Sequence, residues 1–138
     1  MLATGKTITR YVVGLLRQRH GKSLGSEQEL AGILSDMLIE IYAFESAYLR
    51  AVRLSGGKKS NNGKIAAQIV RYLGCRLYDC LMSLINRVIP AVCEPDSVRD
   101  ELLAISGLLS PPPIDTIRLL REIADDCVGK KGYPFKLL

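Results

Sequence analysis

Tryptophan is absent from this 138-residue chain, and aromatic residues make up only 6% of it. A folded core must therefore consist mainly of Leu, Ile, Val and Ala, of which Leu and Ala are strong helix formers. The hydrophobic share of 48% and the charged share of 24% are ordinary for a globular protein and argue against intrinsic disorder. Since a chain of this length fits one domain, we expect a single domain over residues 1–138.

Side chains suited to catalysis are few and scattered. His20 is the only histidine, so any Ser/His/Asp or Cys/His constellation depends on that one residue. Asp36 and Glu40 share one face of a predicted helix, a spacing that would suit a metal or an acid–base site. We favour the simpler interpretation, in which they are surface acids or partners of Arg residues on another helix. The sequence therefore predicts no catalytic residue and no metal ligand.

The cysteines form no C-x-x-C pair, and zinc sites need tighter clusters of Cys and His than this chain offers. Free cysteine is among the most buried residue types. We therefore interpret the cysteines as reduced core thiols, while their even number leaves a disulfide open as the alternative. The residues concerned are Cys75, Cys80, Cys93 and Cys127.

Sequence motifs for phosphate binding and for membrane insertion are missing. Neither G-x-x-x-x-G-K-[ST] nor G-x-G-x-x-G occurs, so we expect no cofactor bound to this chain. Apolar stretches such as Leu102 to Leu109 are far shorter than the ~20 residues of a spanning helix. Residues 1–6 lack the apolar region of a signal peptide. We therefore expect an intracellular protein, cytoplasmic in a bacterium or mitochondrial in a eukaryote.

The net charge of +5 is distributed unevenly, because residues 46–78 contain basic side chains and no acidic one. The simplest interpretation is a solvated exterior. The functional alternative is a basic helical module that contacts an anionic membrane or an acidic protein partner. A nucleic-acid partner is not expected, since no recognition helix or stacking surface can be identified. The candidate contact residues are Arg50, Arg53, Lys58, Lys59, Lys64 and Arg71.

Hydrophobic residues at helical spacing predict three helices, over residues 7–20, 26–54 and 63–89, with a loop over 21–25. Ser26 and Glu29 form an S-x-x-E capping box at the start of the second helix. Pro90 lacks a backbone donor, so the third helix should end or kink there. The second helix has an inner stripe of Leu30, Leu34, Met37, Ile41, Phe44, Tyr48 and Ala51, flanked by Ile33, Leu38, Tyr42, Leu49 and Val52.

Two shorter helices are predicted over residues 98–109 and 114–128, separated by a three-proline connector that no helix can continue through. The last helix has an expected inner stripe of Ile114, Ile117, Leu120 and Ile123. Residues 130–138 form a docked or flexible tail. Strand patterns are lacking, so the predicted fold is all-α: an up-down bundle of about five helices, two of them long.

A family resemblance rests on the segment from Leu34 to Arg50, LSDMLIEIYAFESAYLR. It resembles the L-A-D-x-x-I-[DE]-x-Y-A-x-E-S-x-L-x-R segment of acyl-CoA dehydrogenases, and in particular of the C-terminal helical extension in the very-long-chain type and its bacterial relatives. The order of other motifs agrees. A Gly/Lys/Asn loop and a Cys-bearing helix follow, then PPIDTIRLLREIAD from Pro112 to Asp125, and a final Gly-Tyr-Pro-Phe.

The resemblance implies a non-catalytic piece of a flavin-dependent enzyme of fatty acid β-oxidation. In that family FAD, the catalytic glutamate and the acyl-CoA pocket belong to an upstream core, which is the first implied partner of this chain. The extension packs on that core, contributes to dimer architecture and, in the mitochondrial type, assists membrane association. The resemblance therefore implies a homo-oligomer and a possible peripheral membrane contact, with no oxidation of a thioester by this chain alone.

Overall fold

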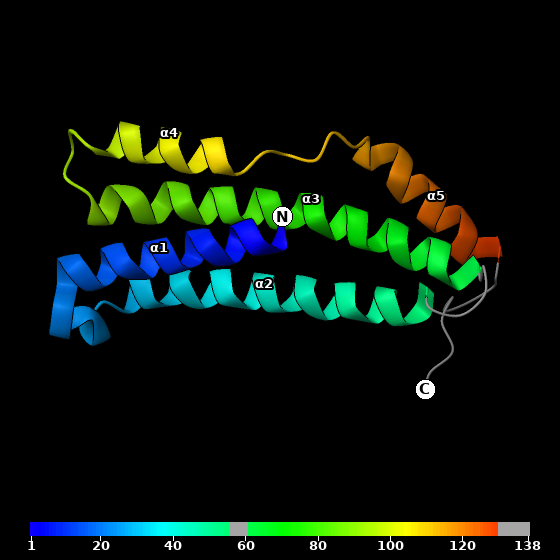
Figure 1. The fold of residues 1–138 in the computed structure, drawn as a ribbon, viewed down its shortest axis with the longest axis horizontal. Coiled ribbons are helices and arrows are strands. Elements are labelled where there is room, and N and C mark those ends of the chain that lie inside the picture. Colours follow the sequence, from blue (N-terminus) through cyan, green and yellow to red (C-terminus); the bar gives the residue numbers. More distant parts are fainter. Residues whose placement is uncertain (56–60, 130–138) are drawn as a thin grey trace. The chain divides into compact units, whose positions relative to one another are not determined.

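The computed structural model describes residues 1–55 and 61–129, and within them it has helices and no strand (Figure 1). The predicted all-α class is confirmed, with two helices much longer than the rest. Lys58, Lys59 and the predicted tail over 130–138 lie outside the described residues. The elements are α1 (Leu2–His20), the 3-10 helix η1 (Gly21–Ser26), α2 (Gln28–Ser55), α3 (Asn61–Val92), α4 (Val98–Leu108) and α5 (Thr116–Gly129).

The chain divides into two compact units. Unit 1 consists of residues 1–43 and 77–111, and unit 2 consists of residues 44–76 and 112–138. Each of the long helices, α2 and α3, therefore contributes one part of its length to each unit. The expectation of one domain over residues 1–138 stays a prediction, and the two units are described separately.

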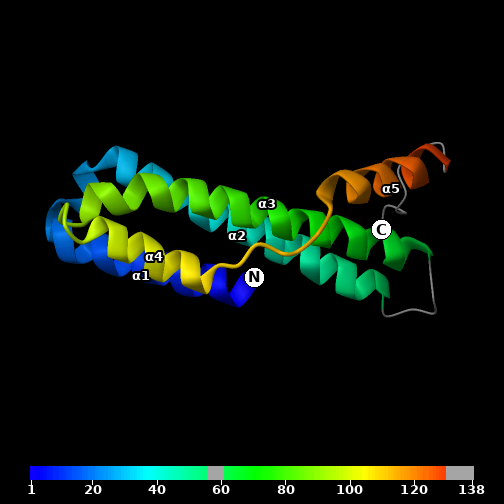
Figure 2. The same ribbon diagram turned by 90° about the horizontal axis from the view of Figure 1, so that it is seen from above.

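Unit 1 is a four-helix bundle in which consecutive helices run in opposite directions. Figure 2 shows α1 and α4 in one layer and the unit 1 parts of α2 and α3 in the other. Its centre is fully shielded from solvent, because every turn of α3 in this unit contributes aliphatic side chains. The buried residues of that segment are Leu77, Leu81, Leu84, Ile85, Val88, Ile89 and Val92.

A glycine sets how closely α1 approaches this core. A Cβ atom added at Gly5 would lie 3.2 Å from Leu81 Cδ1 and 3.8 Å from Ile41 Cδ1. Such a distance is tighter than ordinary van der Waals contact, and Leu81 is fully buried. Gly5 therefore lets the first turn of α1 pack directly on α2 and α3, and Ile8, Val12 and Leu16 continue that contact along the helix.

Unit 2 packs the ends of α2 and α3 with α5, and its buried residues are smaller and fewer. The Phe44 ring lies against Gly74, where an added Cβ would be 3.6 Å from Phe44 Cε2. Among the described residues of this unit, the buried hydrophobic side chains are Phe44, Ala51, Ile65, Ala66, Cys75 and Leu119. Three of these six are Ala or Cys, so unit 2 buries much less apolar surface than unit 1.

Most helix boundaries lie within three residues of the prediction, and the larger differences are at the start of the chain and at residues 21–26. The first helix begins at Leu2 instead of residue 7. It ends as predicted at Gly21, whose φ of 53° is a left-handed conformation that favours glycine. Residues 21–26 form a 3-10 helix instead of a loop, so the Ser26 hydroxyl donates to the Ser23 carbonyl at 2.7 Å. The predicted capping box is therefore wrong.

The third helix does not end at Pro90. It continues to Val92, and the Cys93 amide donates to the Ile89 carbonyl at 3.0 Å. Pro90 is exposed, so the carbonyl one turn earlier, on Asn86, faces solvent and can bond to water instead of an amide. The cost of the missing donor is therefore small, and the apolar contacts of Ile89 and Val92 hold the last turn in place.

The predicted inner stripes are partly wrong. In α2, Tyr48 is 46% exposed, and the flanking stripe is mostly at the surface, with Leu38, Tyr42, Leu49 and Val52 all exposed. In α5 the buried residue is Leu119, whereas Ile117 and Leu120 are exposed. Both errors concern helices with few neighbours, where one face suffices for the core and the remaining apolar residues stay outside.

Candidate interaction surfaces

Across the described ranges 1–55 and 61–129, no group of three or more His, Cys, Asp or Glu residues could hold a metal ion. None of the four cysteines forms a disulfide with another described residue. Cys75 is buried, as predicted, whereas Cys80, Cys93 and Cys127 are only half-buried.

His20 lies in the last turn of α1. Its Nδ1 is 3.6 Å from Glu27 Oε1. Its Nε2 is buried and has no hydrogen-bond partner among the described residues. His20 therefore joins α1 to the residue that precedes α2, and it has the arrangement of a structural histidine.

Polar contacts between α1 and the α3–α4 segment hold one edge of unit 1. The Tyr11 hydroxyl donates to Glu101 Oε2 at 2.6 Å, and Arg19 pairs with Glu94. The hydrogen bond to Glu101, together with burial and the carboxylate charge, raises the pKa of Tyr11 to about 12. Burial and the charge of Glu101 also raise the pKa of the Cys93 thiol, so this cysteine is not an activated nucleophile.

Asp36 and Glu40 do share a surface, as predicted, and it is a groove between α2 and α3 of unit 1. We call it the acidic groove. It has a volume of about 370 Å³ and combines carboxylates with apolar side chains, of which Ile39 is 62% exposed. Its lining residues are Asp36, Ile39, Glu40, Asp79, Cys80, Ser83 and Leu84. The mixture is typical of a surface that contacts protein, with acids placed around an apolar centre.

Unit 2 has an apolar hollow of about 510 Å³ between α2 and α3. Its walls are mostly small or β-branched side chains, and its polar members are Tyr48 and Ser55 on α2 and Arg71 on α3. The complete lining is Tyr48, Ala51, Val52, Ser55, Ala67, Val70 and Arg71. Arg71, a candidate contact residue from the sequence, therefore borders apolar surface.

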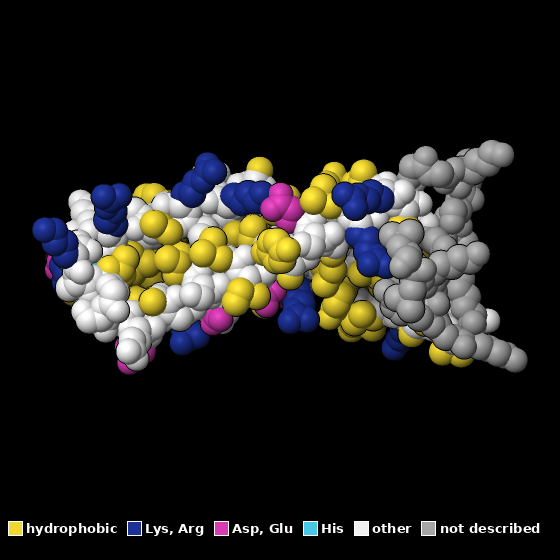
Figure 3. Space-filling view, turned by 90° about the horizontal axis from the view of Figure 1, so that it is seen from below, with side chains coloured by type: hydrophobic (Ala, Val, Ile, Leu, Met, Phe, Trp, Pro, Cys, Tyr) yellow, Lys and Arg dark blue, Asp and Glu magenta, His cyan; other side chains and the backbone are white. Residues whose placement is uncertain are grey.

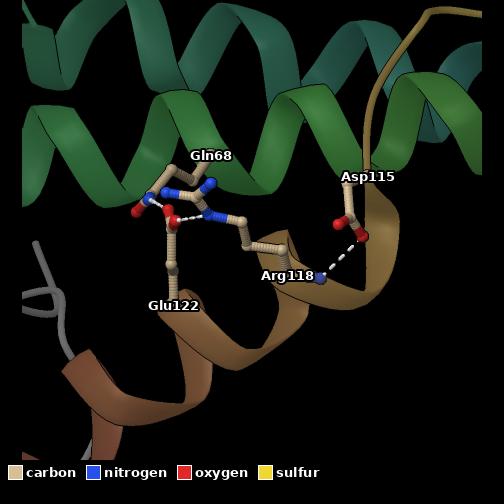
Figure 4. Close-up of polar contacts among 4 residues, drawn as sticks. All are labelled: Gln68, Asp115, Arg118 and Glu122. Atoms are coloured by element: carbon tan, nitrogen blue, oxygen red, sulfur yellow. Dashed lines mark hydrogen bonds and ion pairs between the residues drawn. The ribbon is translucent and has the colours of Figure 1, made fainter.

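Local polar contacts fix α5 in unit 2 (Figure 4). Asp115 Oδ1 accepts a hydrogen bond of 2.9 Å from the Arg118 amide, which caps the helix start. Glu122 accepts from Gln68 Nε2 of α3 at 2.8 Å and from Arg118 Nε at 3.1 Å. A second hollow of about 370 Å³ lies beside Glu122 and includes Lys64.

The described candidate cations belong to unit 2 and are all exposed: Arg50 and Arg53 on α2, Lys64 and Arg71 on α3. None of the four forms an ion pair within the described part of the chain. Figure 3 shows hydrophobic side chains at the surface with Lys and Arg among them. The described helices contain no segment with the length and hydropathy needed to cross a membrane.

Comparison with known proteins identifies the family. Residues 4–106 match the family described as "Acyl-CoA dehydrogenase, C-terminal domain". This chain belongs to that family. The match covers most of the chain and confirms the resemblance inferred from the Leu34–Arg50 segment. The more specific likeness to the very-long-chain type stays a prediction.

Two Bacillus proteins are similar to this chain over nearly all of its length. A "Probable acyl-CoA dehydrogenase" of Bacillus subtilis is 31% identical over 134 residues, which cover 93% of this chain and 22% of that protein. The crystal structure of an acyl-CoA dehydrogenase complexed with FAD, from Bacillus anthracis, matches 96% of this chain and 23% of its own, with a TM-score of 0.88 and 26% identity. The chain thus spans about a fifth of the length of these relatives.

The exposed apolar residues are the feature that the sequence did not predict for this acyl-CoA dehydrogenase C-terminal domain. Ile39 in α2, Leu103 and Leu108 in α4, and Ile117 and Val128 in α5 are each at least 60% exposed. In the sequence, Ile39 and Val128 are apolar residues outside the expected inner stripes, whereas Ile117 was expected inside one. Because single exposed apolar residues are common on any protein, this pattern alone was too weak to indicate an interface.

Proposed function

We propose that this chain is the non-catalytic helical domain of an FAD-dependent acyl-CoA dehydrogenase and that it acts by packing on the catalytic core. The observation that carries the proposal is the match to about a fifth of an FAD-bound acyl-CoA dehydrogenase. A segment of that size fits an accessory domain of the larger enzyme. By the same reasoning, we propose that FAD and acyl-CoA bind elsewhere in the parent enzyme, in the cytoplasm of a bacterium.

Exposed apolar side chains on α4 and α5 support packing on a core. Leu103 and Leu108 lie at the surface of unit 1, and Ile117, Leu120 and Val128 lie at the surface of unit 2. Apolar surface left outside a helical unit is stabilised when a partner covers it, because burial contributes roughly 25 cal/mol per Å². In the proposed enzyme that partner is the flavin-containing core.

Two measurements test this function. The purified chain should show no FAD binding by flavin fluorescence, no acyl-CoA binding by calorimetry and no turnover with an electron acceptor. Co-expressed with the remaining part of the Bacillus subtilis relative, it should co-purify in equal amounts with a protein that retains FAD. Leu103→Glu with Leu108→Glu should reduce co-purification, with Arg10→Glu as a surface control. Tight binding of FAD by the chain alone would contradict the proposal.

A second candidate function is contact with an anionic membrane, favoured by the exposed cations Arg50, Arg53, Lys64 and Arg71, which form no ion pair with another described residue. Such contact is electrostatic, and each basic residue near an anionic surface contributes about 1 kcal/mol. Flotation with vesicles of phosphatidylserine and phosphatidylcholine tests it. Binding at low salt that is lost at high salt supports the membrane function, and no binding at low salt excludes it.

A further inference from the structure

The apolar hollow of unit 2 has room for side chains beyond those of the described helices that line it. All of its lining residues belong to this one unit, and its volume of about 510 Å³ lies in the ~300–1,000 Å³ range of pockets that hold a ligand. Ala51 is buried in it, whereas Val52 on α2 is 51% exposed and Ala67 on α3 is also exposed. A large apolar group that covers these walls would remove them from water, which is favourable.

The tail that follows α5, residues 130–138, contains such groups. Its sequence is KKGYPFKLL, in which Tyr133 and Phe135 flank Pro134. Each aromatic side chain buries ~150–250 Å² when it is covered. Pro134 restricts the backbone between the two rings, so less conformational entropy is lost when the segment binds. The Tyr133-Pro134-Phe135 segment is therefore suited to an apolar pocket with small walls.

The tail starts close enough to reach the hollow. The last turns of α5 and the start of α3 line one shared space, to which Asp126 and Lys64 both belong. Beside Lys64, a Cβ atom added at Gly63 would lie 3.4 Å from the Cα atom of Ser55, which is a lining residue of the apolar hollow. Two successive contacts thus lead from the end of α5 to the hollow. The residues between that end and Phe135 can extend over ~20 Å, which is enough to follow this path.

The polar residues of the hollow indicate which ring it takes. Arg71 is exposed and forms no ion pair with another described residue, and a guanidinium group is attracted to the face of an aromatic ring within ~6 Å. The mostly apolar walls favour the Phe135 ring over the Tyr133 ring, because a tyrosine hydroxyl needs a hydrogen-bond partner when it is buried. Tyr133 is then expected at the edge of the hollow, where its hydroxyl reaches water.

We propose that the Tyr133-Pro134-Phe135 segment docks in the apolar hollow of its own unit, with the Phe135 ring between Val52 and Val70 and the Arg71 guanidinium over its face. The tail then adds apolar surface to a unit whose helices bury few large side chains, and it keeps lipid or another protein out of the hollow. The argument depends on the hollow and on the tail sequence, and it does not depend on the proposed packing against a flavin-containing core.

The test uses fluorine NMR of the 138-residue chain labelled with 4-fluorophenylalanine. The chain has two phenylalanines, so two resonances are expected, one from Phe44 and one from Phe135. A soluble gadolinium chelate should broaden the Phe135 resonance as little as that of Phe44, which is 9% exposed. Val52→Glu should lower the docking equilibrium constant about 10-fold and expose Phe135, because it places a charge in an apolar site. Leu38→Glu, at a position of α2 with 53% exposure in unit 1, should leave Phe135 protected.

A second pair of variants tests the contact with the guanidinium group. Arg71→Gln should shift the Phe135 resonance and weaken docking about 3-fold, whereas Arg50→Gln, which removes the same charge outside the hollow, should change neither. An unchanged Phe44 resonance shows in each variant that unit 2 stays folded.

Three results would overturn the proposal. The first is a Phe135 resonance that the chelate broadens freely in the unchanged chain. The second is a protected Phe135 that does not respond to Val52→Glu, because the tail then docks elsewhere. The third is vesicle flotation or co-purification with the core that depends on Val52 while Phe135 stays accessible, which assigns the hollow to lipid or to the core.

Discussion

Unit 1 and unit 2 use the same two long helices and are stabilised in different ways. In unit 1, four helices surround aliphatic side chains such as Leu81, Ile85 and Val88, which are fully shielded from solvent. In unit 2, two long-helix segments and α5 bury only six hydrophobic side chains among the described residues, three of them Ala or Cys, while Asp115, Gln68 and Glu122 fix α5 through local hydrogen bonds. One helical pattern thus yields a well-packed core where four helices meet and a thin core where three do.

The largest expected effect concerns core packing. Leu81→Ala in unit 1 should reduce the free energy of unfolding by about 4 kcal/mol, because a rigid and fully buried site cannot collapse around the cavity. Leu119→Ala in unit 2 should cost about 2 kcal/mol, since α5 can shift to fill part of the space. Urea unfolding followed by circular dichroism measures both. Equal losses would show that the two cores are equally well packed.

The second prediction concerns a buried hydroxyl in unit 1. Thr9 is 3% exposed, and its Oγ1 has no hydrogen-bond partner among the described residues. Thr9→Val should therefore stabilise the chain by about 1.5 kcal/mol, because it removes a buried polar group without a partner and keeps the side-chain shape. Thr7→Val, at an exposed position of the same helix, serves as the control. A loss of stability in Thr9→Val would show that the Thr9 hydroxyl has a hydrogen-bond partner in solution.

The third prediction tests whether unit 2 depends on its helix cap. Asp115→Ala removes the acceptor for the Arg118 amide and should cost about 1 kcal/mol. Asp115→Asn should retain most of the stability that the alanine variant loses, because the side-chain amide oxygen can accept the same hydrogen bond. In the Asp115→Ala variant, backbone amide hydrogens should exchange faster in α5 than in α1. Uniform changes in both helices would mean that the two units unfold together.

The fourth prediction compares two glycines. Gly32 in α2 has open space around it, so Gly32→Ala should stabilise the chain by about 0.8 kcal/mol through helix propensity. Gly5→Ala gains the same propensity but places a methyl group 3.2 Å from the immobile Leu81. It should be neutral or destabilising in thermal unfolding. A gain at Gly5 equal to that at Gly32 would mean that α1 is packed more loosely than the structure indicates.

The smallest effect is a pH dependence at the edge of unit 1. The pKa of Tyr11 is raised from 10.0 to about 12 in the folded chain. Between these values the unfolded chain releases the phenol proton and the folded chain keeps it, so stability falls as pH rises through this window. Tyr11→Phe should lack this loss, and a phenolate absorbance titration should lose its latest step. An unchanged titration would contradict the Tyr11–Glu101 hydrogen bond.

The sequence predicted helix number and type well, because long apolar patterns at helical spacing are strong signals. Leu30, Met37, Ile41 and Phe44 are buried as the α2 pattern indicated. The pattern was least reliable in α5, where Leu119 and Leu120 both fit a helical stripe. Which of them faces inward depends on the surface of α3, and local periodicity contains no information about that surface.

The candidate surfaces were predicted only in part. A run of basic residues without acids identified Arg50, Arg53, Lys64 and Arg71 as solvent-facing, because clustered charges rarely become buried. The shared face of Asp36 and Glu40 was also clear from their spacing. Ile39 lies on the same helix as these two acids, but the opposite wall with Asp79 and Leu84 comes from a second helix about forty positions later in the chain, so only the folded unit reveals the groove.

The three prolines between α4 and α5 affect the chain before it folds. Pro111, Pro112 and Pro113 restrict the backbone of the unfolded connector, and each proline of this kind lowers the entropy that folding must remove by roughly 0.4–1 kcal/mol. A 14-residue helix such as α5 is marginal in isolation. The stiffness of the connector therefore favours the folding of α5 more than its short length does, because doubling the length of a flexible loop costs only about 0.6 kcal/mol.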